Sequence, residues 1–214
     1  MLNLEEKRLR EGGEFGELAS DEQIERTVQA LKANGIEALV AENANEARRM
    51  FFERVPAGAE VFLGASVTLE TIGIKDEIDS SGRYEALRPK MWAMDRATQG
   101  REIRKLGAAP DYAAGSVHAV TENGQVLIAS NTGSQLGPYV FGAGRVIWVV
   151  GAQKLVKSLE EGMQRIEEYI VPLEEVHMQQ LYNAHTYPSK VLIVNREIKP
   201  GRITMIIVKE QLGF

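Results

Sequence analysis

The apolar residues in the first half of the chain follow two alternating spacings. One is the three-to-four-residue spacing of an amphipathic helix, and the other is the short continuous run of a buried strand. Ser20 and Asn43 each precede a helical stripe, and Gln23 or Glu46 follows three residues later, as in a capping box. The predicted strands are residues 36–41, 61–63 and 84–87, and a third helix is predicted from about 68 to 80. This alternation predicts a parallel sheet covered by helices.

The middle of the chain predicts more strands and two further helices. The predicted strands are residues 112–120, 125–129 and 146–150. The predicted helices are residues 94–106, stopped by Gly107, and a later helix that Ser158 caps and Pro172 ends. Asn123-Gly124 lies between two apolar arms, which is a strong signal for a tight hairpin turn.

The C-terminal part of the chain does not continue the alternation of strand and helix, because two apolar runs lie close together without a helix between them. Residues 191–194 and 203–208 flank Pro200-Gly201, which favours a type II turn and predicts a C-terminal β-hairpin. The predicted fold class is therefore α/β, with a mixed, mostly parallel sheet flanked by helices. We expect an N-terminal arm at residues 1–19, one α/β domain at 20–185 and the hairpin as its extension at 186–214. Since a hairpin presents edge strands that are usually paired, we expect a homo-oligomer.

Composition narrows the class of protein. A net charge of −5 gives no electrostatic case for nucleic acid or an anionic membrane. The longest apolar runs are too short to span a bilayer, and the first residues lack a signal-peptide core, so a cytoplasmic protein is expected. The chain has no cysteine, which excludes disulfides, thiolate zinc sites and iron–sulfur ligation within it. The three histidines lack metal-ligand spacing, and we predict neither a metal nor a cofactor.

Two polar loops follow predicted strands and are candidates for a ligand site. Gly64-Ala65-Ser66 precedes a helix N-terminus, where free N–H groups suit a phosphate or carboxylate. The alternative is that Ser66 only caps that helix. The loop at 130–135 is rich in hydroxyls and amides at the end of a buried strand, although loops are often polar without a function. Lys154, after another buried strand, could neutralise an anion there or lie on the surface.

Ligands of such sheets bind off the carboxyl ends of the strands, so these loops are expected to converge. The predicted cradle for a small anionic ligand consists of Gly64, Ser66, Thr68, Asn131, Thr132, Gly133, Ser134 and Lys154.

Three segments in order resemble the lactate-utilisation (LUD) domain family. They are residues 64–73, 114–124 and 145–156, and the resemblance extends from about residue 20 to residue 173. It implies a fold similar to the sugar-phosphate isomerase and coenzyme A transferase group, and a link to bacterial oxidation of lactate to pyruvate. This chain departs from the family in two ways. It lacks the cysteine clusters of relatives with ferredoxin-like regions, and it has Gln153 where many relatives have asparagine.

Thr121-Glu122-Asn123-Gly124 is similar to the motif around the catalytic glutamate of coenzyme A transferases, whose carboxylate attacks an acyl thioester. The alternative is a hairpin turn that places Glu122 in solvent. Three functions therefore stay open. The first is a component of lactate utilisation that binds a small carboxylate or phosphorylated ligand. The second is a coenzyme A ester transferase or sugar-phosphate isomerase using Glu122. The third is a non-catalytic regulatory subunit with oxidoreductase partners, so the sequence does not decide whether the protein is an enzyme.

Overall fold

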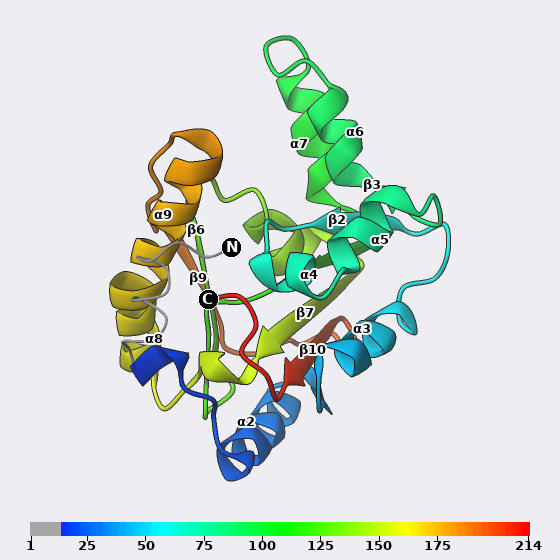
Figure 1. Cartoon of the computed structure of the whole chain (residues 1–214). Helices are drawn as coiled ribbons and strands as arrows, with labels where there is room; N and C mark the ends of the chain where they lie inside the picture. Colours follow the sequence, from blue (N-terminus) through cyan, green and yellow to red (C-terminus); the bar gives the residue numbers. More distant parts are fainter. Residues whose placement is uncertain (1–13) are drawn as a thin grey trace.

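The computed structural model describes residues 14–214, apart from the side chains of Glu14 and Tyr182 (Figure 1). Most of the predicted N-terminal segment at 1–19 lies outside the described residues. The centre of the molecule is sheet A, six parallel strands in the order β1-β10-β7-β4-β2-β3. Their bounds are β1 Glu37–Ala41, β10 Ile203–Val208, β7 Arg145–Gly151, β4 Tyr112–Gly115, β2 Glu60–Leu63 and β3 Glu85–Ala86. The predicted α/β class with a mostly parallel sheet is confirmed.

A second sheet, sheet B, packs against one face of sheet A. Its order is β8-β5-β6-β9, with β5 parallel to β8 and antiparallel to β6, and β9 antiparallel to β6. The bounds are β5 Ala119–Thr121, β6 Val126–Ser130, β8 Leu155–Val156 and β9 Lys190–Val194. Trp148 of β7 and Val126 of β6 belong to the apolar core shared by the two sheets. The predicted strand at 112–120 is thus two strands, and Ser116 to His118 carry the chain from sheet A to sheet B.

The predicted C-terminal β-hairpin is wrong. The Pro200-Gly201 turn forms, with φ of 71° at Gly201 and a hydrogen bond from the Arg202 N–H to the Lys199 carbonyl oxygen at 3.2 Å. The strands on its two sides nevertheless join different sheets, β9 beside β6 and β10 between β1 and β7. All six residues of β10 are buried, as expected for a central parallel strand covered on both faces. A continuous apolar run predicts a strand but does not determine which other strand it pairs with.

Helices pack on both sheets, mostly on their outer faces. Their bounds are α2 Asp21–Ala33, α3 Ala44–Phe52, α4 Val67–Thr71, α5 Ile74–Ser80, α6 Leu87–Ala93, α7 Gly100–Ala108, α8 Leu159–Arg165 and α9 Val171–Tyr182. Single turns of 3-10 or π helix lie at η1 Glu14–Gly16, η2 Pro138–Gly142, η3 Ala152–Lys154 and η4 Ile166–Ile170.

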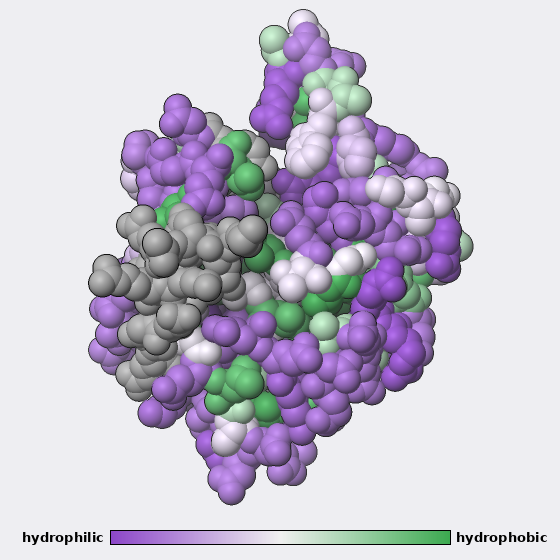
Figure 2. All heavy atoms as spheres, in the orientation of Figure 1, coloured by the Kyte–Doolittle hydropathy of each residue, from purple (hydrophilic) through white to green (hydrophobic). Residues whose placement is uncertain are grey.

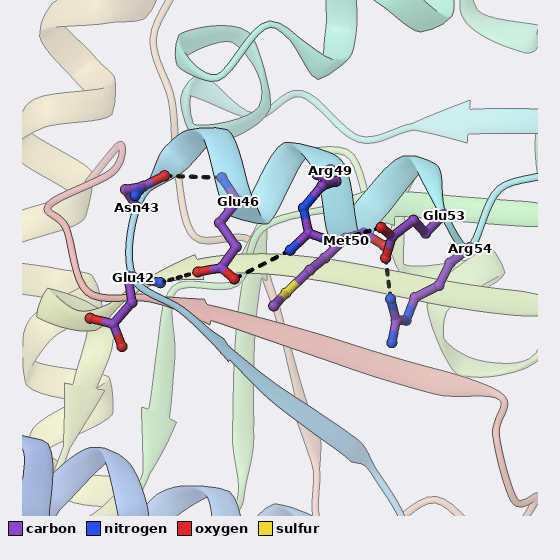
Figure 3. Close-up of polar contacts among 7 residues, drawn as sticks. All are labelled: Glu42, Asn43, Glu46, Arg49, Met50, Glu53 and Arg54. Atoms are coloured by element: carbon purple, nitrogen blue, oxygen red, sulfur yellow. Dashed lines mark hydrogen bonds and ion pairs between the residues drawn. The ribbon is translucent and has the colours of Figure 1, made fainter.

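The predicted caps are present. Asn43 Oδ1 accepts from the Glu46 N–H at 3.0 Å, while the Glu46 carboxylate accepts from the N–H of Glu42 rather than from that of the cap (Figure 3). Arg49 then bridges Glu46 and Glu53 along the exposed side of α3 (Figure 3). Ser20 and Ser158 cap α2 and α8 in the same way. Local side-chain chemistry therefore fixes where these helices start.

Three helix predictions differ from the structure. The helix at 68–80 is divided into α4 and α5 at Gly73, whose φ is 71°. Gly107 lies inside α7 instead of stopping it, because its missing side chain leaves room for Met91 of α6. Pro172 does not end the last helix. The π turn η4 precedes it, and such a turn accommodates a residue that cannot donate a helical hydrogen bond.

Candidate functional site

The loops that follow three neighbouring strands of sheet A meet around Lys154. The Lys154 residue is only 2% exposed. Its Nζ donates to Thr68 Oγ1 at 3.3 Å and to Ser116 Oγ at 3.1 Å. Thr68 lies after β2, Ser116 after β4 and Lys154 after β7, and these strands are adjacent in the sheet. The predicted convergence of Thr68 and Lys154 at the carboxyl edge is therefore present in the structure, and Lys154 is not a surface lysine.

The C-terminal segment, residues 209–214, runs from the end of β10 into this cluster (Figure 1). The Leu212 carbonyl oxygen accepts from Thr68 Oγ1 at 3.1 Å and from Gln153 Nε2 at 3.0 Å. The Leu212 N–H donates to Gln153 Oε1 at 3.3 Å. Gly213 has φ of 65°, and a Cβ on it would lie 2.6 Å from Thr68 Oγ1 and 3.5 Å from Lys154 Nζ. The segment thus lies directly against the donors of the cluster.

A histidine and an arginine extend the cluster toward sheet B. His118 Nδ1 accepts from the Ala129 N–H at 3.1 Å, so a neutral His118 carries its proton on Nε2. Burial, and then the positive charges of Lys154 and Arg165, lower the pKa of His118 to about 3. Arg165 of α8 is fully buried and donates to the His118 carbonyl oxygen at 2.6 Å. Burial lowers the pKa of Arg165 to about 10, which leaves it charged at neutral pH. The interior around His118 is therefore electropositive, and its imidazole is neutral.

The glycines at this edge accommodate a tyrosine. A Cβ on Gly64 would lie 2.7 Å from the Tyr139 hydroxyl, and a Cβ on Gly115 would lie 2.0 Å from it. Tyr139 is buried, donates to the Ala114 carbonyl oxygen at 3.3 Å, and has a pKa that burial raises. Ser66 Oγ accepts from the Leu69 N–H at 3.3 Å, so Ser66 caps α4 as the alternative interpretation expects.

The polar loop at 130–135 lies beside the same edge, but much of its polarity is used within the loop. Ser130 Oγ accepts from the Gly133 N–H at 2.8 Å and donates to Gln135 Oε1 at 3.0 Å. Gly133 takes a left-handed φ of 86°, and the Ser134 N–H donates to Thr132 Oγ1 at 3.3 Å.

The side chains of this loop contact two different neighbours. Gln135 approaches Gly64, with its Cβ 3.6 Å from where a Gly64 Cβ would lie. The exposed Asn131 instead contacts Ser189 and Lys190 at the start of β9. The loop contacts the edge through Gln135, whereas Asn131 contacts the start of β9.

Glu122 lies away from this cluster. The Gly124 N–H donates to the Thr121 carbonyl oxygen at 2.8 Å, and Gly124 has φ of 77°. Only Gly124 of this turn has a positive φ, so the loop is a three-residue turn rather than the expected two-residue one. Glu122 Oε2 accepts from Arg26 Nε of α2 at 3.1 Å, and the Glu122 side chain is 25% exposed. This position favours the turn alternative over a nucleophile in a dry pocket.

Sequence reasoning did not select four residues of the cluster as site residues: Ser116, His118, Gln153 and Gly213. The predicted strand at 112–120 contains Ser116 and His118, and the predicted hairpin extension at 186–214 contains Gly213. One general rule points to these residues, because loops after parallel strands converge at the carboxyl edge of the sheet. The rule makes every residue that follows β4, β7 or β10 a candidate.

Among residues 14–214, no group of three or more histidine, aspartate or glutamate side chains is arranged to hold a metal ion. Within the same residues, no helix is both long and apolar enough to cross a bilayer.

Comparison with known proteins agrees with this fold. A crystal structure of a DUF162 family protein from Deinococcus radiodurans matches 90% of this chain and 99% of its own chain, with a TM-score of 0.54 and 10% sequence identity. At this identity the likeness concerns the fold alone. No curated protein matches this chain. The model of the LUD domain matches residues 24–208. Because that match spans most of the sequence, the chain belongs to the LUD domain family, which is associated with lactate utilisation.

Proposed function

We propose that this protein binds a small carboxylate or phosphorylated ligand at the carboxyl edge of sheet A, as a component of lactate utilisation. The observation that carries the proposal is the placement of Lys154. This lysine is 2% exposed, and its ammonium group, bonded to Thr68 and Ser116, lies where the loops after three strands meet. Ligands of parallel α/β sheets bind at this edge.

The electrostatics of the cluster favour an anion. Arg165 lies behind His118, whose pKa is lowered partly by the charges of Arg165 and Lys154. His118 is neutral at physiological pH and therefore does not add a third cation. A carboxylate or phosphate could accept from Lys154 Nζ and the two hydroxyls, which are donors of the kind that hold such groups. Lactate and pyruvate, the small acids with which the family is associated, both carry a carboxylate.

The C-terminal segment limits how a ligand reaches these donors. Leu212 and Gly213 lie against Thr68, Gln153 and Lys154, and a Cβ on Gly213 would overlap Thr68 Oγ1. A ligand that bonds to Lys154 and Thr68 must replace part of this contact. The proposed mode of binding therefore includes displacement of residues 212–213.

The test is thermal stabilisation of the full chain by lactate, pyruvate and phosphoenolpyruvate. Ligand binding to the folded state raises Tm in proportion to the logarithm of ligand concentration over Kd. We expect Lys154→Met to weaken binding at least about tenfold, since a charge-assisted bond is lost. Ser116→Ala, which keeps the ammonium group, is expected to weaken binding less.

Lys157→Met is the matched control, because Lys157 is exposed and three residues away. It should retain the wild-type response. Wild-type protein that no acid stabilises, or Lys154→Met protein that responds like wild type, would contradict the proposal. Far-UV circular dichroism of each variant distinguishes lost binding from lost folding.

A further inference from the structure

A pair of helices projects from the molecule and carries a charge opposite to that of the whole chain. We call residues 87–108 the arm, which comprises α6, α7 and the turn between them. Figure 1 shows the arm extending away from both sheets, and its base lies against β2 and η2. The arm contains six basic and two acidic side chains, a net charge of +4, while the chain has a net charge of −5. Such a concentration of positive charge on a projecting element is typical of a contact surface for an acidic partner.

The composition of the arm also suits a protein interface. Trp92 is 53% exposed and has the guanidinium of Arg88 over its ring at 5.0 Å. Met91 of α6 and Met94, which follows the helix, are partly exposed. Tryptophan, arginine and methionine are enriched in protein interfaces, and tryptophan and arginine dominate their binding energy. In the space-filling view the arm shows hydrophilic residues with paler and hydrophobic ones among them (Figure 2).

The basic residues of the arm have few acidic neighbours in their own chain. Lys90 pairs with Glu85. For Arg96, Arg101, Arg104 and Lys105, no ion pair with a carboxylate is formed within residues 14–214. These four side chains are exposed. Their charge is therefore available to a second molecule.

The same chain carries a surface of matching chemistry. We call residues 159–182 the acidic ridge, which comprises α8, η4 and α9. The ridge contains six glutamates and no lysine, and its one arginine, Arg165, is buried. Glu160, Glu167 and Glu168 are exposed and pair with no basic side chain of the described residues. Leu181, at the end of the ridge, is 58% exposed and offers an apolar contact for Trp92.

From these two surfaces we infer that the arm of one copy docks on the acidic ridge of a second copy. Each copy carries both surfaces, so two equivalent arm–ridge contacts form in a two-fold dimer. Complementary charge orients the two copies, and the exposed tryptophan contributes binding energy. It replaces the predicted C-terminal hairpin as the physical basis for the expected homo-oligomer.

The test is the mass of the full chain in solution, by size-exclusion chromatography with light scattering, at about 0.05 M and about 0.5 M NaCl. We expect a dimer at the lower salt and a larger monomer fraction at the higher salt. The arm variant Arg101→Glu/Arg104→Glu and the ridge variant Glu167→Arg/Glu168→Arg should each be monomeric. An equimolar mixture of the two variants should recover the wild-type mass, because each then supplies the surface that the other has reversed.

Arg196→Glu/Lys199→Glu makes the same change of charge at exposed positions outside the arm, and this control should keep the wild-type mass. A monomeric wild-type chain at low salt would overturn the proposal, even if the arm then proved to bind nucleic acid or an unrelated acidic protein. Variants that keep the wild-type mass, or a mixture that stays monomeric, would overturn it as well. None of these variants alters Lys154, Thr68 or Ser116, so this result is independent of the ligand experiment.

Discussion

Two polar loops of this chain look alike in the sequence and differ completely in the structure. The loop after β7 carries Lys154, and the turn after β5 carries Glu122; both are charged residues next to buried strands. Lys154 is 2% exposed and bonded to two hydroxyls from other strand ends. Glu122 is partly exposed and paired with Arg26 on the surface of α2.

The difference comes from the sheet to which each strand belongs. Sheet A is parallel, so the loops at the carboxyl ends of its strands gather at one edge and bury one another. The turn after β5 joins two antiparallel strands of sheet B, and a hairpin turn faces outward at the end of its sheet. A charged residue after a strand becomes a site candidate only where several loops converge on it.

The largest expected effect comes from filling the space at the converging edge. A Cβ at Gly115 would lie 2.0 Å from the buried Tyr139 hydroxyl. We expect Gly115→Ala to lower the free energy of unfolding by about 2–3 kcal/mol in urea denaturation, as overpacking of a core does. Adding Tyr139→Phe should recover part of that loss, because the clash is with the hydroxyl.

Gly58→Ala is the control for this pair. Gly58 has a positive φ, 81°, and nothing lies within 4 Å of the added Cβ, so the cost there is backbone strain alone, about 1 kcal/mol, without a clash. If Gly115→Ala cost no more than Gly58→Ala, the edge would be less closely packed than described.

The next effect is a pH dependence of stability caused by His118. Its pKa is about 3 in the folded protein and about 6.5 in an unfolded chain, so the unfolded state binds more protons between these values. Stability from this group is therefore present above pH 6.5 and is lost as the pH falls toward 3. Between pH 6 and 4, the wild type should lose up to about 1.4 kcal/mol per pH unit more than His118→Asn.

Equilibrium denaturation at several pH values measures this slope. Asparagine keeps an acceptor for the Ala129 N–H but does not titrate. Equal slopes for the wild type and His118→Asn would show that His118 is not held neutral beside Lys154 and Arg165.

The smallest expected effect is at the turn. Glu122→Gln removes one partner of an exposed ion pair, and such pairs contribute little to stability. We expect Tm and the response to small acids to match the wild type in thermal-shift measurements. A loss of ligand response in Glu122→Gln, at unchanged Tm, would restore Glu122 as a functional residue and remove the contrast between the two loops.

The sequence by itself determined the local elements. The caps at Ser20, Asn43 and Ser158, the turn at Gly124 and the buried strands could be predicted because each depends on residues within a few positions of one another. Thr68 and Lys154 could be selected as site candidates because a general rule places ligands after parallel strands. The sequence also predicted the α/β class from the alternation of strand and helix.

Only the tertiary structure decided which strands pair and which loops meet. β9 and β10 are neighbours in the sequence, but burial of β10 on both faces is satisfied only between β1 and β7, so the predicted hairpin does not form. Thr68 and Lys154 are 86 positions apart, and they touch because β2, β4 and β7 lie in that order in one sheet. The contacts of Ser116, Gln153 and Gly213 follow from the same strand order. Such contacts depend on the burial of whole elements against one another, which no local spacing of residues specifies.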